Sequence, residues 1–541
     1  MRTVILGGTV YDGSGGPPVC KDVLIENGRI LDVGHFSQIE NSVRIDAKGM
    51  AVTPGFIDSH RHGDFAVFTD AGFGEAELAQ GVTTMLVGNC GMSAAPAAGN
   101  FREEWYGFIE PCLGKPPKGK LWETFPQYLD QLEKRELPLN VGALIGLGSV
   151  KTAVKGFSSQ AWTSQEMREG QRMVVEALEA GAWGVSCGIM YMPECYWSSK
   201  DYIKLLRPAA AYKRPLCCHM RGEGDGLEEA VAEAIEIASG AGLGLHISHF
   251  KATGKKNWKR SLPGAIERIR QAREEGQDVT VDFYPYTGGS TTLMTLLPPG
   301  CHKEDIKSTL SWLSEKEGVQ QLREELLKDH PGWENMVKSI GWERILISSV
   351  ATEKNKGAQG RAFPQVCESG GDQDEAACMA RLLREEKGKV GIIVMSMDPG
   401  DVDMAAGLPY GSVISDGLYG APGFPHPRLY GAFPRVWSEY VIKRGILTPE
   451  EAVYKMSGLP ARRFGLGDRG RIQKGMRADI NLFNPGKFHD TATFTDPVRL
   501  AEGMDMVLIN GEAVWNKGKW TRRRTADLLR AENILIESEL T

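Results

Sequence analysis

The hydrophobic positions of this chain change their spacing twice, so three segments are predicted. Near both ends, short apolar runs alternate with turn residues, and each end contains an Asn-Gly pair, Asn27-Gly28 and Asn510-Gly511, between two such runs. Asn-Gly supplies the positive φ angles of a tight turn and therefore predicts a β-hairpin at each end. Because a few strands cannot close a core alone, we expect the two ends to pair as one small β-sandwich.

The middle of the chain has the pattern of an α/β domain. Short apolar runs, typical of strands, lie at 56–58, 83–87, 141–145, 184–187, 216–218, 245–248, 279–283 and 413–415. Longer amphipathic stretches such as 165–180 and 226–240 separate several of them and predict helices. About eight such strand–helix units indicate a TIM (β/α)8 barrel with a parallel sheet.

The domain division follows from these patterns. Residues 1–54 form the N-terminal part of the sandwich, and 55–465 form the barrel. Further strand patterns at 344–348 and 390–395 and a helix pattern at 319–327 do not fit the eight units, so we expect an insertion at about 288–395. Residues 466–541 complete the sandwich, and 516–541 are predicted to be a helical tail.

Composition narrows the class of protein. The 541 residues are 42% hydrophobic and carry a formal net charge of −6, which gives no reason to expect nucleic acid or a membrane as partner. No apolar run is long enough to span a bilayer, and the first residues read as a strand rather than a signal peptide. The ten cysteines lack the spacing of a disulfide scaffold. We therefore expect a cytoplasmic protein that acts on a small molecule; its oligomeric state is left open.

Polar residues recur where the predicted strands end, which is the edge that carries the active site in such barrels. The first strand is followed by His60 and His62, whose side chains share one face of an extended chain because they are two residues apart. Later strands end at Cys90, His219, His249 and Asp416. Thiol, imidazole and carboxylate groups are zinc ligands, so this convergence predicts a metal site.

The ordered motifs are similar to those of the amidohydrolase superfamily, and within it to the N-acyl-D-amino-acid deacylases, or D-aminoacylases. The resemblance covers residues 1 to about 520. The matching motifs are Pro54-Gly55-Phe56-Ile57-Asp58-Ser59-His60-Arg61-His62, Gly88-Asn89-Cys90-Gly91, Gly188-Ile189-Met190-Tyr191-Met192-Pro193, His219-Met220-Arg221, Ser248-His249-Phe250-Lys251, Asp282-Phe283-Tyr284-Pro285-Tyr286, Ser415-Asp416-Gly417, His426-Pro427-Arg428 and Gly475-Met476-Arg477-Ala478-Asp479.

The resemblance implies a function and roles for the matching residues. A tight zinc site would use Cys90, His219 and His249, and a weaker second site would use His60, His62 and Asp416. Many amidohydrolases instead place a carboxylated Lys on the fourth strand, where this chain has no Lys. Zinc would polarise the amide of an N-acyl-D-amino acid, with Asp416 as general acid and base, and hydrolysis would release a carboxylate and a D-amino acid.

The substrate carboxylate needs a cation and hydrogen-bond donors. Lys251 is predicted because it lies two residues beyond His249, and Arg221 because it lies two beyond His219. Family analogy adds Tyr191, Tyr284, Ser290 and Arg428. One departure concerns the third strand, where the family often has Gly-His-Gly and this chain has Leu147 between two glycines. Two alternatives stay open: a cyclic-amide hydrolase or deaminase on the same barrel, and a non-catalytic barrel.

Overall fold

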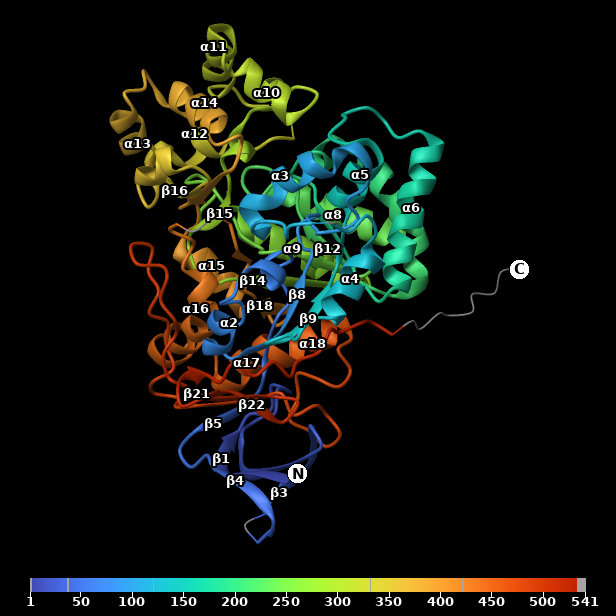
Figure 1. Cartoon of the computed structure of the whole chain (residues 1–541), viewed down its shortest axis with the longest axis vertical. Helices are drawn as coiled ribbons and strands as arrows, with labels where there is room; N and C mark the ends of the chain where they lie inside the picture. Colours follow the sequence, from blue (N-terminus) through green and yellow to red (C-terminus); the bar gives the residue numbers. More distant parts are fainter. Residues whose placement is uncertain (1, 37, 120, 331, 421–422, 533–541) are drawn as a thin grey trace, which may run out of the picture.

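The computed structural model describes residues 2–36, 38–119, 121–330, 332–420 and 423–532. The two ends of the chain lie in one sheet, at the bottom of Figure 1. Its order is β23-β22-β21-β20-β5-β1-β2-β3, with β4 beside β1. The bounds of these strands are β1 (Arg2–Val10), β2 (Val19–Glu26), β3 (Arg29–Gly34), β4 (Ser42–Asp46), β5 (Ala51–Pro54), β20 (Ile480–Phe483), β21 (Met504–Ile509), β22 (Glu512–Asn516) and β23 (Lys519–Trp520).

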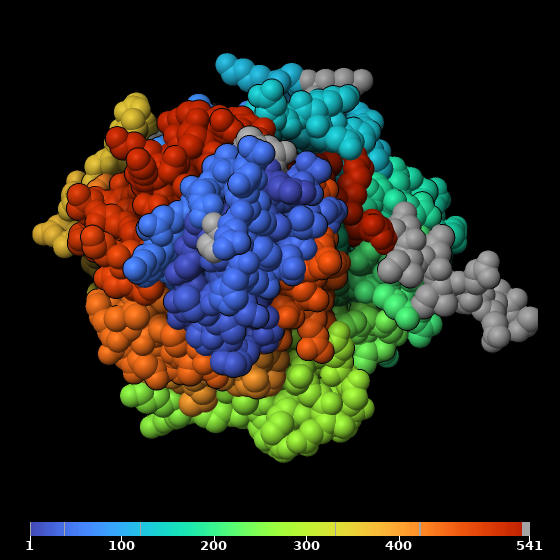
Figure 2. Space-filling model, turned by 90° about the horizontal axis from the view of Figure 1, so that it is seen from below, coloured from blue at the N-terminus to red at the C-terminus, as the bar shows by residue number. Residues whose placement is uncertain are grey.

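The expected pairing of the two ends is confirmed by the contact between β5 and β20, which run antiparallel with Thr53 opposite Asn481. Both predicted hairpins are present, and Asn27 and Asn510 have the positive φ angles, 51° in each case, that the turns require. Side chains from both ends, such as Ile25 and Leu482, share one apolar core. Seen from below, the N-terminal residues lie in the middle of this face with C-terminal residues around them (Figure 2).

Parallel strands form the centre of the molecule. One sheet has the order β6-β8-β9 and a second has β10-β11-β12-β13-β14-β18; β9 continues into β10 across Leu144. β7 and β19 pair in parallel, so the residues that follow β18 lie beside those that follow β6. The bounds are β6 (Phe56–Asp58), β7 (Arg61–His62), β8 (Val82–Val87), β9 (Asn140–Ala143), β10 (Ile145–Gly146), β11 (Val185–Gly188), β12 (Leu216–His219), β13 (Leu245–Ile247), β14 (Val279–Phe283), β18 (Gly411–Val413) and β19 (Gly417–Leu418).

Helices cover these strands on the outside (Figure 1). The predicted helices at 165–180 and 226–240 are α6 and α8, and α6 begins with a capping box in which Thr163 and Glu166 exchange hydrogen bonds. The bounds of the helices around the parallel strands are α1 (Ala66–Thr69), α2 (Glu75–Ala79), α3 (Arg102–Leu113), α4 (Phe125–Glu133), α5 (Leu147–Lys155), α6 (Ser164–Glu179), α7 (Ser199–Leu206), α8 (Leu227–Ala241), α9 (Ser261–Glu274), α15 (Pro399–Gly407), α16 (Arg428–Arg435), α17 (Pro449–Val453) and α18 (Leu459–Phe464).

The segment between β14 and α15 builds a separate layer at the top of Figure 1. Its antiparallel sheet has the order β15-β17-β16, and its buried residues form a second apolar core. The bounds are β15 (Gly289–Thr292), β16 (Ile345–Val350), β17 (Val390–Val394), α10 (Ile306–Trp312), α11 (Lys316–Glu325), α12 (Met336–Ile340), α13 (Phe363–Gly370) and α14 (Glu375–Glu385). We call residues 288–396 the cap segment.

The predicted helical tail is wrong for residues 516–532. Lys519–Trp520 pairs with β22, and the chain beyond it runs in extended form along the parallel strands. The Leu529 amide donates to the Val141 carbonyl at 2.8 Å, so the tail satisfies its backbone groups against existing strands rather than in a helix. Residues 533–541 lie outside the described residues. In the described part of the chain, every helix is too short or too polar to cross a bilayer.

Candidate metal centre and active site

The six predicted ligands meet at the carboxyl ends of the parallel strands. Each is at most 6% exposed. They form three overlapping groups, and within each group the ligand atoms lie within 4.8 Å of one another. The groups are His60, His62 and Cys90; Cys90, His219 and His249; and His60, His249 and Asp416.

The backbone turns three of these side chains inward. Cys90, His249 and Asp416 have φ angles of 53°, 36° and 50°, a region that non-glycine residues seldom adopt and that costs about 1–3 kcal/mol each. Specific contacts hold the turns in place: the Asp416 amide donates to the His60 carbonyl at 2.9 Å, and the His249 amide donates to the Asp282 carboxylate. Strain at three converging residues indicates a functional site.

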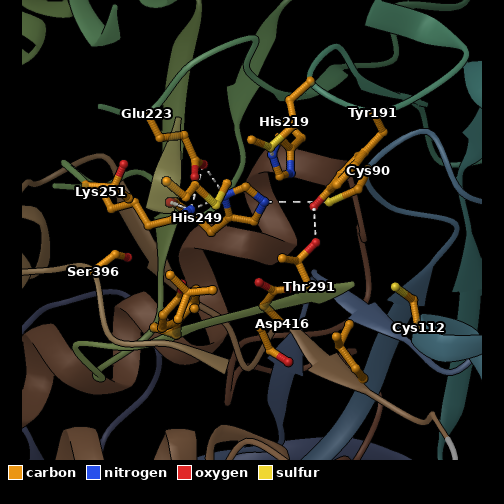
Figure 3. A pocket seen from close by; sticks show the side chains of 18 of the residues that line it. Cys90, Cys112, Tyr191, His219, Glu223, His249, Lys251, Thr291, Ser396 and Asp416 are labelled. Carbon is orange, nitrogen blue, oxygen red and sulfur yellow. Dashed lines mark hydrogen bonds and ion pairs between the residues drawn. The ribbon is translucent and has the colours of Figure 1, made fainter. Parts of the chain in front are cut away.

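Cys90, His219 and His249 form the first group, seen in Figure 3. The Cys90 sulfur lies 3.6 Å from His249 Nε2, and the two imidazole rings are 4.3 Å apart. Burial lowers the pKa of His219 well below its usual value and also lowers that of His249, so both rings are neutral and offer lone pairs. His219 Nδ1 is buried without a hydrogen-bond partner among the described residues. These groups are placed as metal ligands would be.

His60, His62 and Asp416 lie directly beside the first group. Asp416 Oδ1 is 3.3 Å from His62 Nε2 and 3.6 Å from His60 Nε2, and His60 Nε2 is 3.2 Å from the Cys90 sulfur. Burial lowers the pKa of His62 to about 4. Burial opposes ionisation of Asp416, but Arg428 and His60 outweigh it and hold the pKa of that carboxyl well below its usual range. Asp416 is therefore ionised and able to accept a proton.

Two carboxylates behind the ligands were missed by sequence reasoning. Asp282, on β14, lies 3.4 Å from His60 Nδ1 and 3.0 Å from His246 Nε2. Glu223 Oε1 lies 2.9 Å from His249 Nδ1. Both are buried, yet hydrogen bonds with His246 and His60 hold the pKa of Asp282 below its usual range, and the Lys251 ammonium does the same for Glu223. A carboxylate on one imidazole nitrogen directs the other nitrogen toward the metal. The available signal was that Asp282 is charged within an apolar strand.

The proposed substrate residues, except Arg221, line one cavity with five of the six predicted ligands, His62, Cys90, His219, His249 and Asp416. The Lys251 ammonium is 2.6 Å from Glu223, and Arg428 Nη2 is 2.8 Å from Asp416 Oδ2. The Arg428 guanidinium carbon also lies 4.4 Å from the centre of the Tyr284 ring. The three other proposed donors, Tyr191, Tyr284 and Ser290, line the same cavity. The Tyr191 ring is 4.6 Å from that of His219, and the Ser290 hydroxyl donates to the Ile392 carbonyl at 3.1 Å.

Arg221 lies elsewhere, which corrects the sequence prediction. Its guanidinium is 2.8 Å from Glu233 and donates to the carbonyls of Cys195 and Trp197, so its donors are used to hold a loop. Leu147, at the start of α5, is fully buried in the main core and is absent from the described lining of the metal cavity.

Comparisons with known proteins agree with this geometry. A sequence profile of the amidohydrolase family matches residues 44–189 and 405–515. The chain is 34% identical to N-acyl-D-glutamate deacylase of Alcaligenes xylosoxydans xylosoxydans, over 95% of this chain and 94% of that protein. It is 31% identical to D-aminoacylase of the same organism, over 97% of each.

Solved structures of such deacylases are also similar to this chain. N-acyl-D-glutamate deacylase from Bordetella bronchiseptica, in complex with zinc and a phosphonate mimic of the tetrahedral intermediate, has a TM-score of 0.83 and 32% identity over 98% of this chain and 99% of that one. A D-aminoacylase with a binuclear metal centre has a TM-score of 0.81 and 30% identity over the same shares of the two chains. A D-hydantoinase at 14% identity, with a TM-score of 0.55 over 98% of this chain and 100% of that one, shares the fold alone.

Proposed function

Because this chain belongs to the amidohydrolase family, and within it to the N-acyl-D-amino-acid deacylases, we propose that it hydrolyses the amide bond of N-acyl-D-amino acids with the help of zinc. The products would be a carboxylate and a D-amino acid. We also propose that the parallel strands close as a TIM barrel at 55–465, with the cap segment as its insertion. The two chain ends, 1–54 and 466–541, would then supply the small β-sandwich and a C-terminal tail.

The observation that carries the proposal is the convergence of one thiol, four imidazoles and one carboxylate on a buried point. The donor set fits zinc, since sulfur and imidazole nitrogen are its usual ligands and His219 Nδ1 has no other described partner. Cys90, His219 and His249 would hold the tight ion, and His60, His62 and Asp416 a weaker second one. Zinc supplies Lewis acidity, which polarises the amide carbonyl and makes water acidic enough to ionise near neutral pH.

The protein's own side chains would transfer the proton and bind the substrate. Asp416, ionised and beside both histidines of the first strand, would accept the proton of the attacking water and pass it to the leaving amine. Arg428 would hold that carboxylate in place through its 2.8 Å contact. Lys251 and Arg428, with Tyr191, Tyr284 and Ser290, would bind the substrate α-carboxylate in the same cavity.

The Asp416→Ala variant tests the catalytic role. We expect kcat to fall by about 10²–10⁴-fold, the usual worth of a general acid–base group, while at least the tight zinc remains bound. Steady-state hydrolysis and metal analysis of the same preparation measure both. Turnover equal to that of the wild-type protein would reject the role. A panel of N-acetyl-D-amino acids, their L-forms, hydantoins and dihydropyrimidines separates this reaction from cyclic-amide hydrolysis.

A further inference from the structure

The metal cavity has a wall that the ligand set does not explain. It comes from the cap segment, which contributes Thr291 from β15, Val394 from β17 and both Met336 and Ile340 from α12. Met336 and Ile340 are four residues apart and so lie on one face of that helix. Thr291 ties this wall to the metal centre, because its hydroxyl is 3.4 Å from that of Tyr191, whose ring packs on His219 (Figure 3).

The metal cavity has few cationic side chains, and each is already paired with a carboxylate. Among the described residues that line it, Lys251 and Arg428 are the only Lys or Arg side chains. Lys251 lies 2.6 Å from Glu223, and Arg428 lies 2.8 Å from Asp416. The α-carboxylate of any N-acyl amino acid would use this pair. A second carboxylate, on the substrate side chain, would meet hydroxyl groups and apolar surface but no further cation.

Lysines of the adjoining cavity do not supply the missing cation. That cavity shares Thr253 and Ser339 with the metal cavity and is lined by Lys255, Lys256 and Lys338. All three are in ion pairs with carboxylates: Lys255 with Glu343, Lys256 with Asp225 and Lys338 with Asp329. Their side chains are 48%, 67% and 50% exposed, so they face solvent rather than the metal.

On the basis of the proposed function, we infer that this enzyme takes N-acyl-D-amino acids with an uncharged, mainly apolar side chain, and that the α12 face of Met336 and Ile340 contacts that side chain. Burying a carboxylate without a partner costs several kcal/mol, whereas methylene groups of methionine or leucine gain from contact with Met336, Ile340 and Val394. The substrate side chain would therefore differ from the glutamate named in the two N-acyl-D-glutamate deacylases above.

The test begins with the wild-type protein loaded with zinc. We expect kcat/KM for N-acetyl-D-methionine and N-acetyl-D-leucine to exceed that for N-acetyl-D-glutamate by at least about 100-fold, because only the last buries an unpaired charge. N-acetyl-D-glutamine, which has nearly the shape of the glutamate substrate, isolates the charge and should exceed it by about tenfold or more. A preference for glutamate would overturn the inference and leave the proposed function standing. Zinc binding without hydrolysis of any D-substrate would instead reject the proposed function.

Two variants locate the contact. Met336→Arg places a cation on the wall at a half-buried position and should raise the ratio of kcat/KM for the glutamate over the glutamine substrate by about tenfold, as one ion pair would. Lys338→Gln, on the same helix, removes an exposed charge and should leave that ratio unchanged. An unchanged ratio in a folded, zinc-loaded Met336→Arg protein would remove α12 from the side-chain subsite. A large fall in glutamate hydrolysis for Lys338→Gln would show that this lysine supplies a cation and would overturn the inference.

Discussion

Replacing Glu223 with glutamine should weaken zinc binding although Glu223 is not a proposed ligand. Its Oε1 lies 2.9 Å from His249 Nδ1 and 2.6 Å from the Lys251 ammonium, and the side chain is buried. The charge orients the His249 ring so that Nε2 faces Cys90. A neutral amide keeps the shape but removes the charge that both partners need.

The magnitude follows from these contacts. Loss of a carboxylate behind a metal-bound histidine costs about 10–100-fold in metal affinity, which corresponds to about 1.4–2.8 kcal/mol. The variant should also change the pKa of Lys251. In the wild-type protein burial lowers this pKa, but Glu223 outweighs burial and raises it; without the Glu223 charge the pKa of Lys251 should fall. We therefore also expect KM for N-acyl-D-amino acids to rise.

The assay is competition for zinc between the metal-free protein and a chromogenic chelator, followed by steady-state kinetics at saturating zinc. Glu233→Gln is the matched control, since it makes the same chemical change in an ion pair with Arg221 outside the metal cavity. Zinc affinity should stay at the wild-type value in the control. Equal affinities in the wild-type protein and the Glu223→Gln variant, or equal losses in both variants, would refute the reasoning.

Three further predictions follow from the same structure. Lys251→Ala should raise KM for N-acyl-D-amino acids by about tenfold or more through loss of a charged contact, and an unchanged KM would exclude Lys251 from substrate binding. Gly91→Ala should lower stability to urea by about 1–3 kcal/mol and reduce bound zinc, since its Cβ would lie 2.9 Å from the Gly188 amide nitrogen and Gly91 has φ 73°. Burial raises the pKa of Glu194 from 4.5 to about 8, so this residue favours the folded state below pH 4.5 and loses that effect as pH rises toward 8. The stability of the wild-type protein relative to Glu194→Gln should fall over that interval in urea titrations, and parallel pH curves would contradict this.

Much of the architecture was predictable because it depends on local pattern. Asn27-Gly28 and Asn510-Gly511 predicted their hairpins, since those residues adopt the required φ angles at low cost. The convergence of Cys90 and His219 followed from strand ends alone, because parallel strands present their carboxyl ends at one edge. The roles of these residues as ligands remain predictions that metal analysis can test.

The sequence by itself determined most strands of the parallel sheets, that the two chain ends pair, and that thiol, imidazole and carboxylate groups gather at one edge of these strands. Only the tertiary structure decided which charged groups meet. Arg221 contacts Glu233 rather than the cavity, Glu223 supports His249, and α12 of the cap segment forms a wall of the metal cavity. Strand formation depends on neighbours in sequence, whereas these contacts depend on loop paths and on a cap segment inserted far along the chain, which hydrophobic periodicity does not encode.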